Sequence, residues 1–314
     1  MPPIYTVTLN PGLDRTLSVP KLHENAVLRA TDSRLDWGGK GFNVTRALQA
    51  LQIESVAMGI VGGFTGQMLT QGLQQLGITT DFVQIAGESR TNTVIEEAGS
   101  GRYIKVNEAG PPVARAALDA LCSRILTQVT AGSYCALCGS LPPGTPSTFY
   151  AELITLIQNQ GAFACLDASG EALRHGIQAA PFLVKPNAEE AAEFTGITIT
   201  DAAAAQRAAR AFLDQGVTLV ALSMGADGLL LARREQTLHA RPPQVGVQTV
   251  VGVGDALLAG LLYALHHKLP LFEMARWGVA AGTAAAMTPG VGVGDLAQVA
   301  ALAEQVTVVS LPLL

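Results

Sequence analysis

The stretch "VVGVGDALLAGLL" places a carboxylate, Asp255, directly after two glycines and before an unbroken apolar run. Aspartate is a favoured N-cap residue, so one interpretation is that Asp255 caps a helix. In the other interpretation, the glycines expose backbone N–H groups at a helix N-terminus, where an anion such as a phosphoryl group binds. A carboxylate has a reason to lie there if it takes the proton of an attacking hydroxyl.

A second glycine-rich stretch, "WGGKGFNVTRAL", is also suited to a ligand site. Gly38, Gly39 and Gly41 permit a tight backbone at the start of a helix. Lys40 adds a cation, and Asn43 offers both a donor and an acceptor on the first helical turn. The alternative interpretation is an ordinary glycine-rich turn between a strand and a helix.

Two further stretches carry polar groups at the ends of predicted strands. In "VKPNAEEAAEF", Lys185 ends a strand, and Asn187 and Glu190 open a helix. Acidic residues suit the dipole of a helix start, but this pair also offers the one or two oxygen ligands that a hydrated Mg²⁺ takes from protein. In "LSMGADG", Ser223 and Gly225 form either a phosphate or ribose contact or a plain loop.

Short apolar runs alternate with segments of helical periodicity along most of the chain. The runs are "IYTVTL", "SVAMGIVGG", "YCALCGSLP", "FACLDASG", "FLVKPN" and "LVALSMG". This alternation predicts an α/β fold, doubly wound, with a mostly parallel sheet and helices on both faces. In such sheets, ligands bind beyond the carboxyl ends of the strands.

Two polar segments, residues 12–36 and 90–109, interrupt the alternation with Thr, Val and turn residues but no helical periodicity. They predict hairpins in a small separate β-sheet, a discontinuous lid on a core of residues 1–11, 37–89 and 110–314. So small a sheet has a face to cover, and a substrate or a second subunit would cover it.

Composition excludes several classes of function. The chain has 314 residues, is 49% hydrophobic and carries a net charge of −5, which fits a folded enzyme and argues against a nucleic-acid partner. No uncharged apolar stretch reaches the roughly 18 residues of a membrane helix, and the N-terminus lacks a leader pattern, so we expect a cytoplasmic protein with no membrane partner. The four cysteines are expected to be buried thiols, because no second pair completes a zinc site.

Two common nucleotide-binding fingerprints are missing from the sequence. There is no G-x-x-x-x-G-K-[ST], and no strand-borne G-x-G-x-x-G followed by an acid about 20 residues later. A P-loop NTPase and a Rossmann-type oxidoreductase are therefore disfavoured.

Six motifs occur in the order found in ribokinase-like carbohydrate kinases. They are "TLNPGLD" at 8–14, "GGKGFNV" at 38–44, "GESRTNT" at 87–93, "GSLPPG" at 139–144, "KPNAEE" at 185–190 and "GVGDALLAG" at 252–260. The chain resembles the phosphofructokinase-B branch of that family over nearly its whole length. The resemblance implies the ribokinase-like α/β fold with a β-lid, and ATP and Mg²⁺ as cofactors.

The resemblance also implies a role for each matching residue. Asp255 matches the catalytic base, and its anion hole consists of Gly252, Val253 and Gly254. The sugar phosphate would be bound by Asp14, Gly38, Gly39, Lys40, Asn43, Arg90, Ser140 and Arg29, with Lys40 and Arg29 included for their charge and position. ATP would be bound by Lys185, Asn187, Ser223, Gly225, Thr249 and Gly254. Mg²⁺ would be held through Asn187 and Glu190.

Two positions depart from the family pattern. Val250 stands where Thr is usual, and Ala256 where Ser is common, so a hydroxyl contact to the nucleotide is either missing or supplied by Thr249.

The resemblance implies phosphorylation of a ketohexose monophosphate to the bisphosphate. Lys40 within "GGKG" favours fructose 1-phosphate or tagatose 6-phosphate over fructose 6-phosphate, and we take fructose 1-phosphate as the leading substrate. A non-catalytic sugar-phosphate-binding protein is the more remote alternative. The family's lid often pairs two subunits, so we expect a homodimer.

Overall fold

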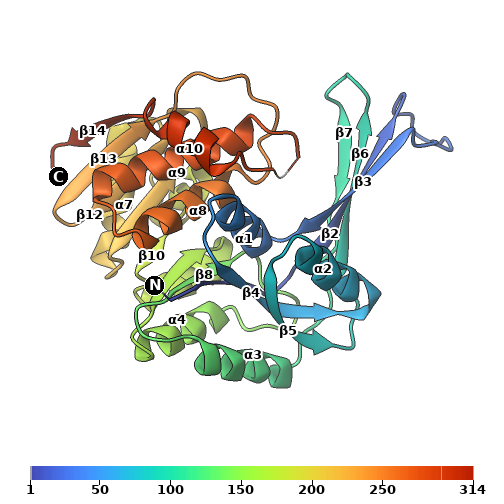
Figure 1. The fold of residues 1–314 in the computed structure, drawn as a ribbon, viewed down its shortest axis with the longest axis horizontal. Coiled ribbons are helices and arrows are strands. Elements are labelled where there is room, and N and C mark those ends of the chain that lie inside the picture. The colour runs from blue at the N-terminus through green and yellow to red at the C-terminus, as the bar shows by residue number, and fades with distance from the viewer. Residues whose placement is uncertain (1, 291, 314) are drawn as a thin grey trace.

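A computed structural model describes residues 2–290 and 292–313 and contains one large sheet (Figure 1). Its strand order is β14-β13-β12-β11-β10-β9-β8-β1-β4-β5. The strands from β5 to β11 in this order run parallel, and β12, β13 and β14 add an antiparallel edge. Their bounds are β1 (Ile4–Thr8), β4 (Ser55–Gly62), β5 (Thr79–Ile85), β8 (Tyr134–Cys138), β9 (Phe163–Asp167), β10 (Leu183–Val184), β11 (Leu219–Ser223), β12 (Leu229–Arg233), β13 (Gln236–Arg241) and β14 (Thr307–Leu311).

Helices cover both faces of this sheet and bury its apolar side chains. One face packs against α3 (Arg115–Gln128), α4 (Phe149–Asn159), α5 (Gly170–Gln178), α6 (Ala188–Thr195) and α7 (Ala202–Asp214). The other packs against α1 (Lys40–Ala50), α2 (Gly63–Gln75), α8 (Val253–His266), α9 (Leu271–Ala286) and α10 (Leu296–Ala303). The predicted doubly wound α/β class is confirmed. All six apolar runs identified in the sequence form strands of the sheet.

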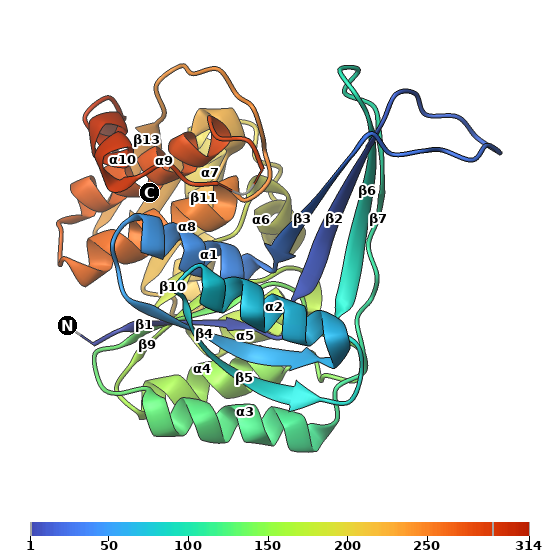
Figure 2. The same cartoon turned by 45° about the vertical axis from the view of Figure 1, so that its right-hand side comes forward.

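A separate four-stranded sheet, the small sheet, projects from the core (Figure 2). Its order is β3-β2-β6-β7, with bounds β2 (Gly12–Val19), β3 (Asp32–Gly38), β6 (Arg90–Glu97) and β7 (Tyr103–Val106). At its base, the Trp37 ring packs against α2 at Gly72, where any side chain would collide with the indole. β3 runs two residues past position 36 and leads through Gly39 into α1, so the small sheet and α1 are joined without a linker.

The carboxyl ends of the parallel strands bring distant motifs to one edge of the large sheet. β9 ends on Asp167, β10 leads into Lys185, and β11 ends on Ser223. Parallel strands point the same way, so these residues meet although they are far apart in sequence. An isolated parallel bridge between Asn187 and Ser223 extends the contact between two of the segments.

Candidate active site

Asp255 lies in the first turn of α8 and is not its cap. The N-cap is Gly252, whose φ of 76° is in the left-handed region that favours glycine, and no side chain caps this helix. The Asp255 side chain is 7% exposed, and its Oδ2 accepts a hydrogen bond of 2.8 Å from Nδ2 of Asn43 on α1. The capping interpretation is therefore wrong, and two glycine-rich stretches more than 200 residues apart meet at one partly buried hydrogen bond.

The environment of Asp255 makes it a better base than an ordinary aspartate. Burial, together with the negative charge of Asp167, raises the pKa of Asp255 to about 6, although Asn43, Lys40 and Lys185 act in the opposite direction. A carboxylate with a pKa near 6 is still mostly ionised at neutral pH and has more affinity for a proton than one with a pKa near 4. Asp255 can therefore accept a proton from a hydroxyl held against it.

Asp167, at the end of β9, is a charged residue whose role the sequence analysis missed. Its side chain is fully buried between two lysines, with Oδ1 2.9 Å from Nζ of Lys40 and Oδ2 3.2 Å from Nζ of Lys185. Burial alone would raise the pKa of Asp167, but the two ammonium groups outweigh burial and lower it. The available signal was the position of an Asp as the last residue of an apolar parallel strand.

The ammonium group of Lys40 faces two carboxylates, those of Asp167 and Glu190. Its Nζ contacts Asp167 and lies 4.0 Å from Oε1 of Glu190. Burial works against its charge, yet Asp167 and Glu190 raise the pKa of Lys40 above its ordinary value. The sequence analysis assigned Lys40 to the sugar phosphate by its charge, and the structure places its ammonium against Asp167 and near Glu190.

Asn187 and Glu190 form a capping box at the start of α6. Oδ1 of Asn187 accepts from the Glu190 backbone N–H at 2.8 Å, and Oε2 of Glu190 accepts from the Asn187 backbone N–H at 2.9 Å. The helix-start interpretation is therefore realised. Oε1 of Glu190 remains directed toward Lys40, so the carboxylate still faces the cluster.

The other candidate nucleotide residues border the same edge. The Ser223 backbone N–H donates to the Pro186 carbonyl, and Ser223 forms a parallel bridge with Asn187. Gly225 opens the short 3₁₀ helix η1 (Gly225–Asp227), and a Cβ at Gly225 would meet no other atom. Thr249 lies in the loop before α8, where its Oγ accepts a hydrogen bond from the Val251 backbone N–H at 3.1 Å. Val250, in place of the usual Thr, is 82% exposed beside it.

Asp14 and Asn92 form a partly buried polar pair on the small sheet. Nδ2 of Asn92 donates to Oδ1 of Asp14 at 2.7 Å, and the Asp14 carboxylate lies over Gly38, which has no side chain to obstruct it. Oδ1 of Asn92 and Oδ1 of Asn43 are buried without a hydrogen-bond partner in the described structure. Buried orphan acceptors are costly, so these two amides are suited to the hydroxyl groups of a polar ligand. Asn92 was not singled out from the sequence.

Arg90 and Ser140 lie on either side of Asn10. Arg90 donates from Nε to the Asn10 carbonyl at 3.1 Å and from one terminal nitrogen to the Glu108 carbonyl at 3.3 Å. Ser140 accepts from Nδ2 of Asn10 at 3.4 Å. Both residues therefore adjoin the loop that leads into β2 and Asp14.

The structure does not bring Arg29 to this site. Arg29 is exposed in the loop between β2 and β3, which leaves the small sheet opposite the end where Gly12 pairs with Gly38 (Figure 2). The intervening strand length is roughly 20 Å. The sequence analysis assigned Arg29 to the site from its charge and approximate position. Neither of these shows at which end of a hairpin a residue lies.

The backbone at Gly252 gives a stability prediction. We expect Gly252→Ala to lower the free energy of unfolding by about 1–2 kcal/mol, because a Cβ in the left-handed region meets the carbonyl oxygen. Gly254→Ala is the matched control: its φ is not positive, so its stability should equal or exceed that of the wild type. Urea unfolding of both variants measures this, and equal losses would contradict the strain argument.

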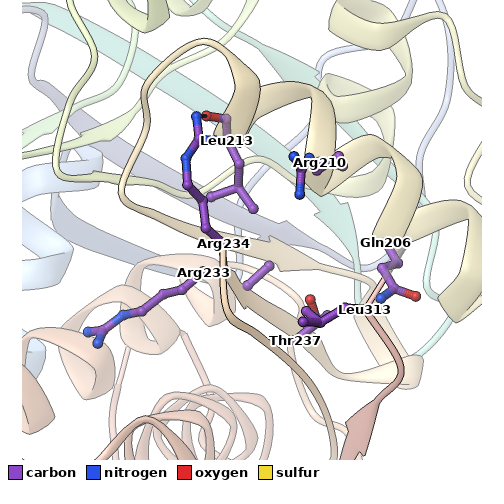
Figure 3. Close-up of a pocket in the computed structure, with 8 residues that line it drawn as sticks. Gln206, Arg210, Leu213, Arg233, Arg234, Thr237 and Leu313 are labelled. Carbon is purple, nitrogen blue, oxygen red and sulfur yellow. Dashed lines mark hydrogen bonds between the residues drawn. The ribbon is translucent and has the colours of Figure 1, made fainter.

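Two cavities lie outside the group of charged residues around Asp167. A cavity of about 20 Å³ between α7, β12 and Leu313 has room for about one water, and its Arg210 and Arg234 already bond to Asp214 and the Leu213 carbonyl (Figure 3). A larger one, about 250 Å³, is lined by residues next to Asn187 and Ser223 in sequence, among them Ala188 and Met224. Within the described chain, no helix is long and apolar enough to cross a membrane.

A buried carboxylate at the N-terminus of a glycine-capped helix, at the carboxyl edge of a parallel sheet, is suited to transfer of a phosphoryl group to a hydroxyl. The chain belongs to the pfkB family of carbohydrate kinases, whose sequence model matches residues 12–297. The carbohydrate kinase expected from the six motifs is confirmed.

Relatives with related names match along nearly the whole chain. The 1-phosphofructokinase of Rhodobacter capsulatus is 36% identical over 310 residues, covering 98% of each chain. That of Vibrio cholerae is 33% identical over 308 residues, covering 98% of this chain and 97% of the relative. Among solved structures, phosphofructokinase-2 from Escherichia coli in complex with fructose-6-phosphate superposes with a TM-score of 0.90 at 29% identity, covering 97% and 99% of the two chains.

Proposed function

We propose that this kinase transfers the γ-phosphoryl group of ATP to fructose 1-phosphate and forms fructose 1,6-bisphosphate. The observation that carries the proposal is the buried Asp255, held by Asn43 at the glycine-capped start of α8. The names of the curated relatives support the substrate. Tagatose 6-phosphate and fructose 6-phosphate are the alternative acceptors.

In the proposed reaction, the free terminal hydroxyl of the sugar lies against Asp255. The hydroxyl oxygen bonds to the γ-phosphorus as the bond from phosphorus to the bridging oxygen breaks, and ADP leaves. The hydroxyl proton passes to the Asp255 carboxylate. The backbone N–H groups of Gly252, Val253 and Gly254 at the start of α8 would stabilise the charge on the transferring group.

The charge of the cluster supports a requirement for magnesium. The ammonium groups of Lys40 and Lys185 face the carboxylates of Asp167, Glu190 and ionised Asp255, so the cluster carries one excess negative charge. A free polyphosphate would be repelled unless a cation accompanied it. Within residues 2–290 and 292–313 no group of three or more His, Cys, Asp or Glu forms a closed metal cage, which suits Mg²⁺ that keeps several waters. Bound Mg²⁺ would neutralise phosphate charge, with Glu190 and Asn187 beside its waters.

The polar face of the small sheet would hold the sugar. Asp14 and Asn92 are register partners on β2 and β6, so their side chains lie on the same side of the sheet. The unpartnered Oδ1 atoms of Asn92 and Asn43 would accept hydrogen bonds from sugar hydroxyls. We infer that the small sheet acts as a lid that excludes water from the reaction.

The opposite face of the small sheet supports a homodimer. Leu35, Ile104 and Val106 are 41%, 52% and 58% exposed, and the register places them on the side away from Asp14 with Leu17 and Ile95. Contiguous exposed apolar side chains on a sheet are typical of a protein–protein contact. We propose that a second copy of the chain covers this face.

We expect Ile104→Asp to convert a dimer into a monomer, because a carboxylate would be buried against apolar side chains. Light scattering after size-exclusion chromatography measures the mass. Lys105→Asp is the matched control, since its side chain points to the other face and the mass should not change. A monomeric wild type would exclude this dimer.

A steady-state panel with fructose 1-phosphate, tagatose 6-phosphate and fructose 6-phosphate tests the substrate. We expect the highest kcat/KM with fructose 1-phosphate, and no turnover without a divalent cation. A higher kcat/KM with another acceptor would change the proposed substrate and leave the proposed phosphoryl transfer unchanged. Binding of all three without any ATP-dependent transfer would instead indicate a sugar-phosphate-binding protein.

A further inference from the structure

Asp167 has no step in the proposed reaction, yet it is the most completely buried charge in the cluster. Its side chain is 0% exposed, whereas that of Lys40 is 38% exposed. Burying a carboxylate costs free energy unless cations and hydrogen bonds compensate for it. The ammonium groups of Lys40 and Lys185 compensate for the burial of Asp167. The position of Lys185 indicates what Asp167 holds in place.

The ammonium group of Lys185 lies at the first turn of α8. A Cβ built on Gly254 would lie 3.4 Å from Nζ of Lys185, so the ammonium approaches the backbone that forms the proposed anion hole. Lys185 is 5% exposed on its side chain and sits one strand away from Asp167. Its cation is therefore located where negative charge develops on a transferring phosphoryl group.

In the described part of the chain, the ammonium of Lys185 has a single ion-pair partner. Among the described residues, Asp167 is the single ion-pair partner of its Nζ, at 3.2 Å, and no side-chain hydrogen bond to a different group is formed. A lysine side chain has four flexible methylene groups and does not hold its ammonium at a fixed point by itself. Without the carboxylate, the ammonium of Lys185 would no longer be held beside Gly254.

We propose that Asp167 is a positioning residue that holds the ammonium of Lys185 beside Gly254, where it meets the transferring phosphoryl group. This inference rests on the proposed function of the site. In this proposal, Asp167 contacts neither substrate, and its effect on the reaction passes through the lysine.

A double-mutant cycle on kcat tests the proposal, because residues that act through one another give non-additive losses. We expect Asp167→Asn and Lys185→Met each to lower kcat by about 100-fold, with KM for the sugar phosphate within about threefold of wild type. The double variant should lie within about threefold of Lys185→Met. Additive losses, near 10⁴-fold, or a near-normal kcat in Asp167→Asn would overturn the proposal.

Folding controls keep the cycle interpretable. Asp81→Asn removes an aspartate that pairs with Arg124 away from the site and should leave kcat unchanged. If Asp167→Asn does not fold, the same cycle is measured in a Lys40→Met background, where the loss of Asp167 leaves only one buried cation unpaired. A cycle that is additive there contradicts the proposal equally.

The outcome is separable from the fate of the proposed function. A wild type that transfers phosphate to none of the three sugar phosphates contradicts the proposed function. The inference is then tested by calorimetric binding of Mg²⁺ and ADP to the same four proteins. Non-additive weakening supports a Lys185 held by Asp167, and independent weakening overturns it.

Discussion

Asp255→Asn should lower kcat by at least about 100-fold while leaving the Kd for the sugar phosphate within a few-fold. The amide keeps the shape of the side chain and can keep a hydrogen bond with Asn43, but it cannot take the hydroxyl proton. Steady-state kinetics and calorimetric binding measure the two quantities. A variant that turned over near the wild-type rate would show that Asp255 is not the base.

The pH dependence of kcat/KM in wild type and in Asp255→Asn gives an independent check. A pKa of about 6 for Asp255 predicts that wild-type kcat/KM rises with pH through about 6 and levels off above it, because the base must be deprotonated. The residual activity of Asp255→Asn should lack this limb. Measuring both profiles at constant ionic strength separates the titration of Asp255 from that of the substrate phosphate, which is common to both proteins.

The raised pKa also makes Asp255 a cost to stability at neutral pH. A carboxyl whose pKa is higher in the folded than in the unfolded state contributes stability that is fully present below the unfolded pKa, near 4, and is lost as pH rises through about 6. At pH 8, Asp255→Asn should therefore be more stable than wild type by about 2–3 kcal/mol, and at about pH 3 the two should be nearly equal. Denaturant unfolding at both pH values measures the difference.

The second large effect is expected for Arg90→Ala. We assign Arg90 to the existing phosphate of the substrate, and losing such a charge-assisted contact should cost about 2–3 kcal/mol, or roughly 30- to 150-fold in kcat/KM. KM for the sugar phosphate should rise much more than KM for ATP. The Arg90 side chain packs over Gly12 and is held by the Asn10 and Glu108 carbonyls, so its guanidinium is already oriented before the substrate binds.

Free fructose is the control for the role of Arg90. It has no phosphate for the guanidinium to hold, so any slow phosphorylation of free fructose should hardly change in Arg90→Ala. Arg90→Lys keeps the charge but loses the forked geometry, and should recover part of the loss. Equal losses on the phosphorylated and the free sugar would mean that Arg90 only supports the loop at Asn10.

The alternation of strands and helices, and the two glycine-rich helix starts, could be predicted from local sequence patterns, because apolar periodicity and glycine spacing are local signals. The contact between Asn43 and Asp255 spans 212 positions, and no local pattern contains it. The sequence analysis assigned both residues to one site only because both lie in motifs of a known family, and it did not predict their contact. Asp167 was missed for the complementary reason: a single acid at the end of a strand has no distinctive local pattern, and its two lysines come from other segments.

The directions of long side chains were also beyond the sequence. Lys40 was placed at the sugar phosphate because its charge fitted, but the net attraction of Asp167 and Glu190 sets its direction. Arg29 was placed by charge in the same way and lies at the far end of the small sheet. Asn92 emerged from the β2–β6 register, since a pairing between strands about 80 positions apart is a tertiary property.

The packing of Trp37 against α2 provides an optical reporter at the base of the small sheet. The chain has two tryptophans, and the other, Trp277, stacks on Tyr263 between α8 and α9. Trp277→Phe would leave a single indole, that of Trp37, whose emission depends on how closely the base of the small sheet packs against α2 at Gly72. Stopped-flow fluorescence of that variant would test the lid movement that we propose without any attached dye, and would show whether the sugar or the nucleotide drives it.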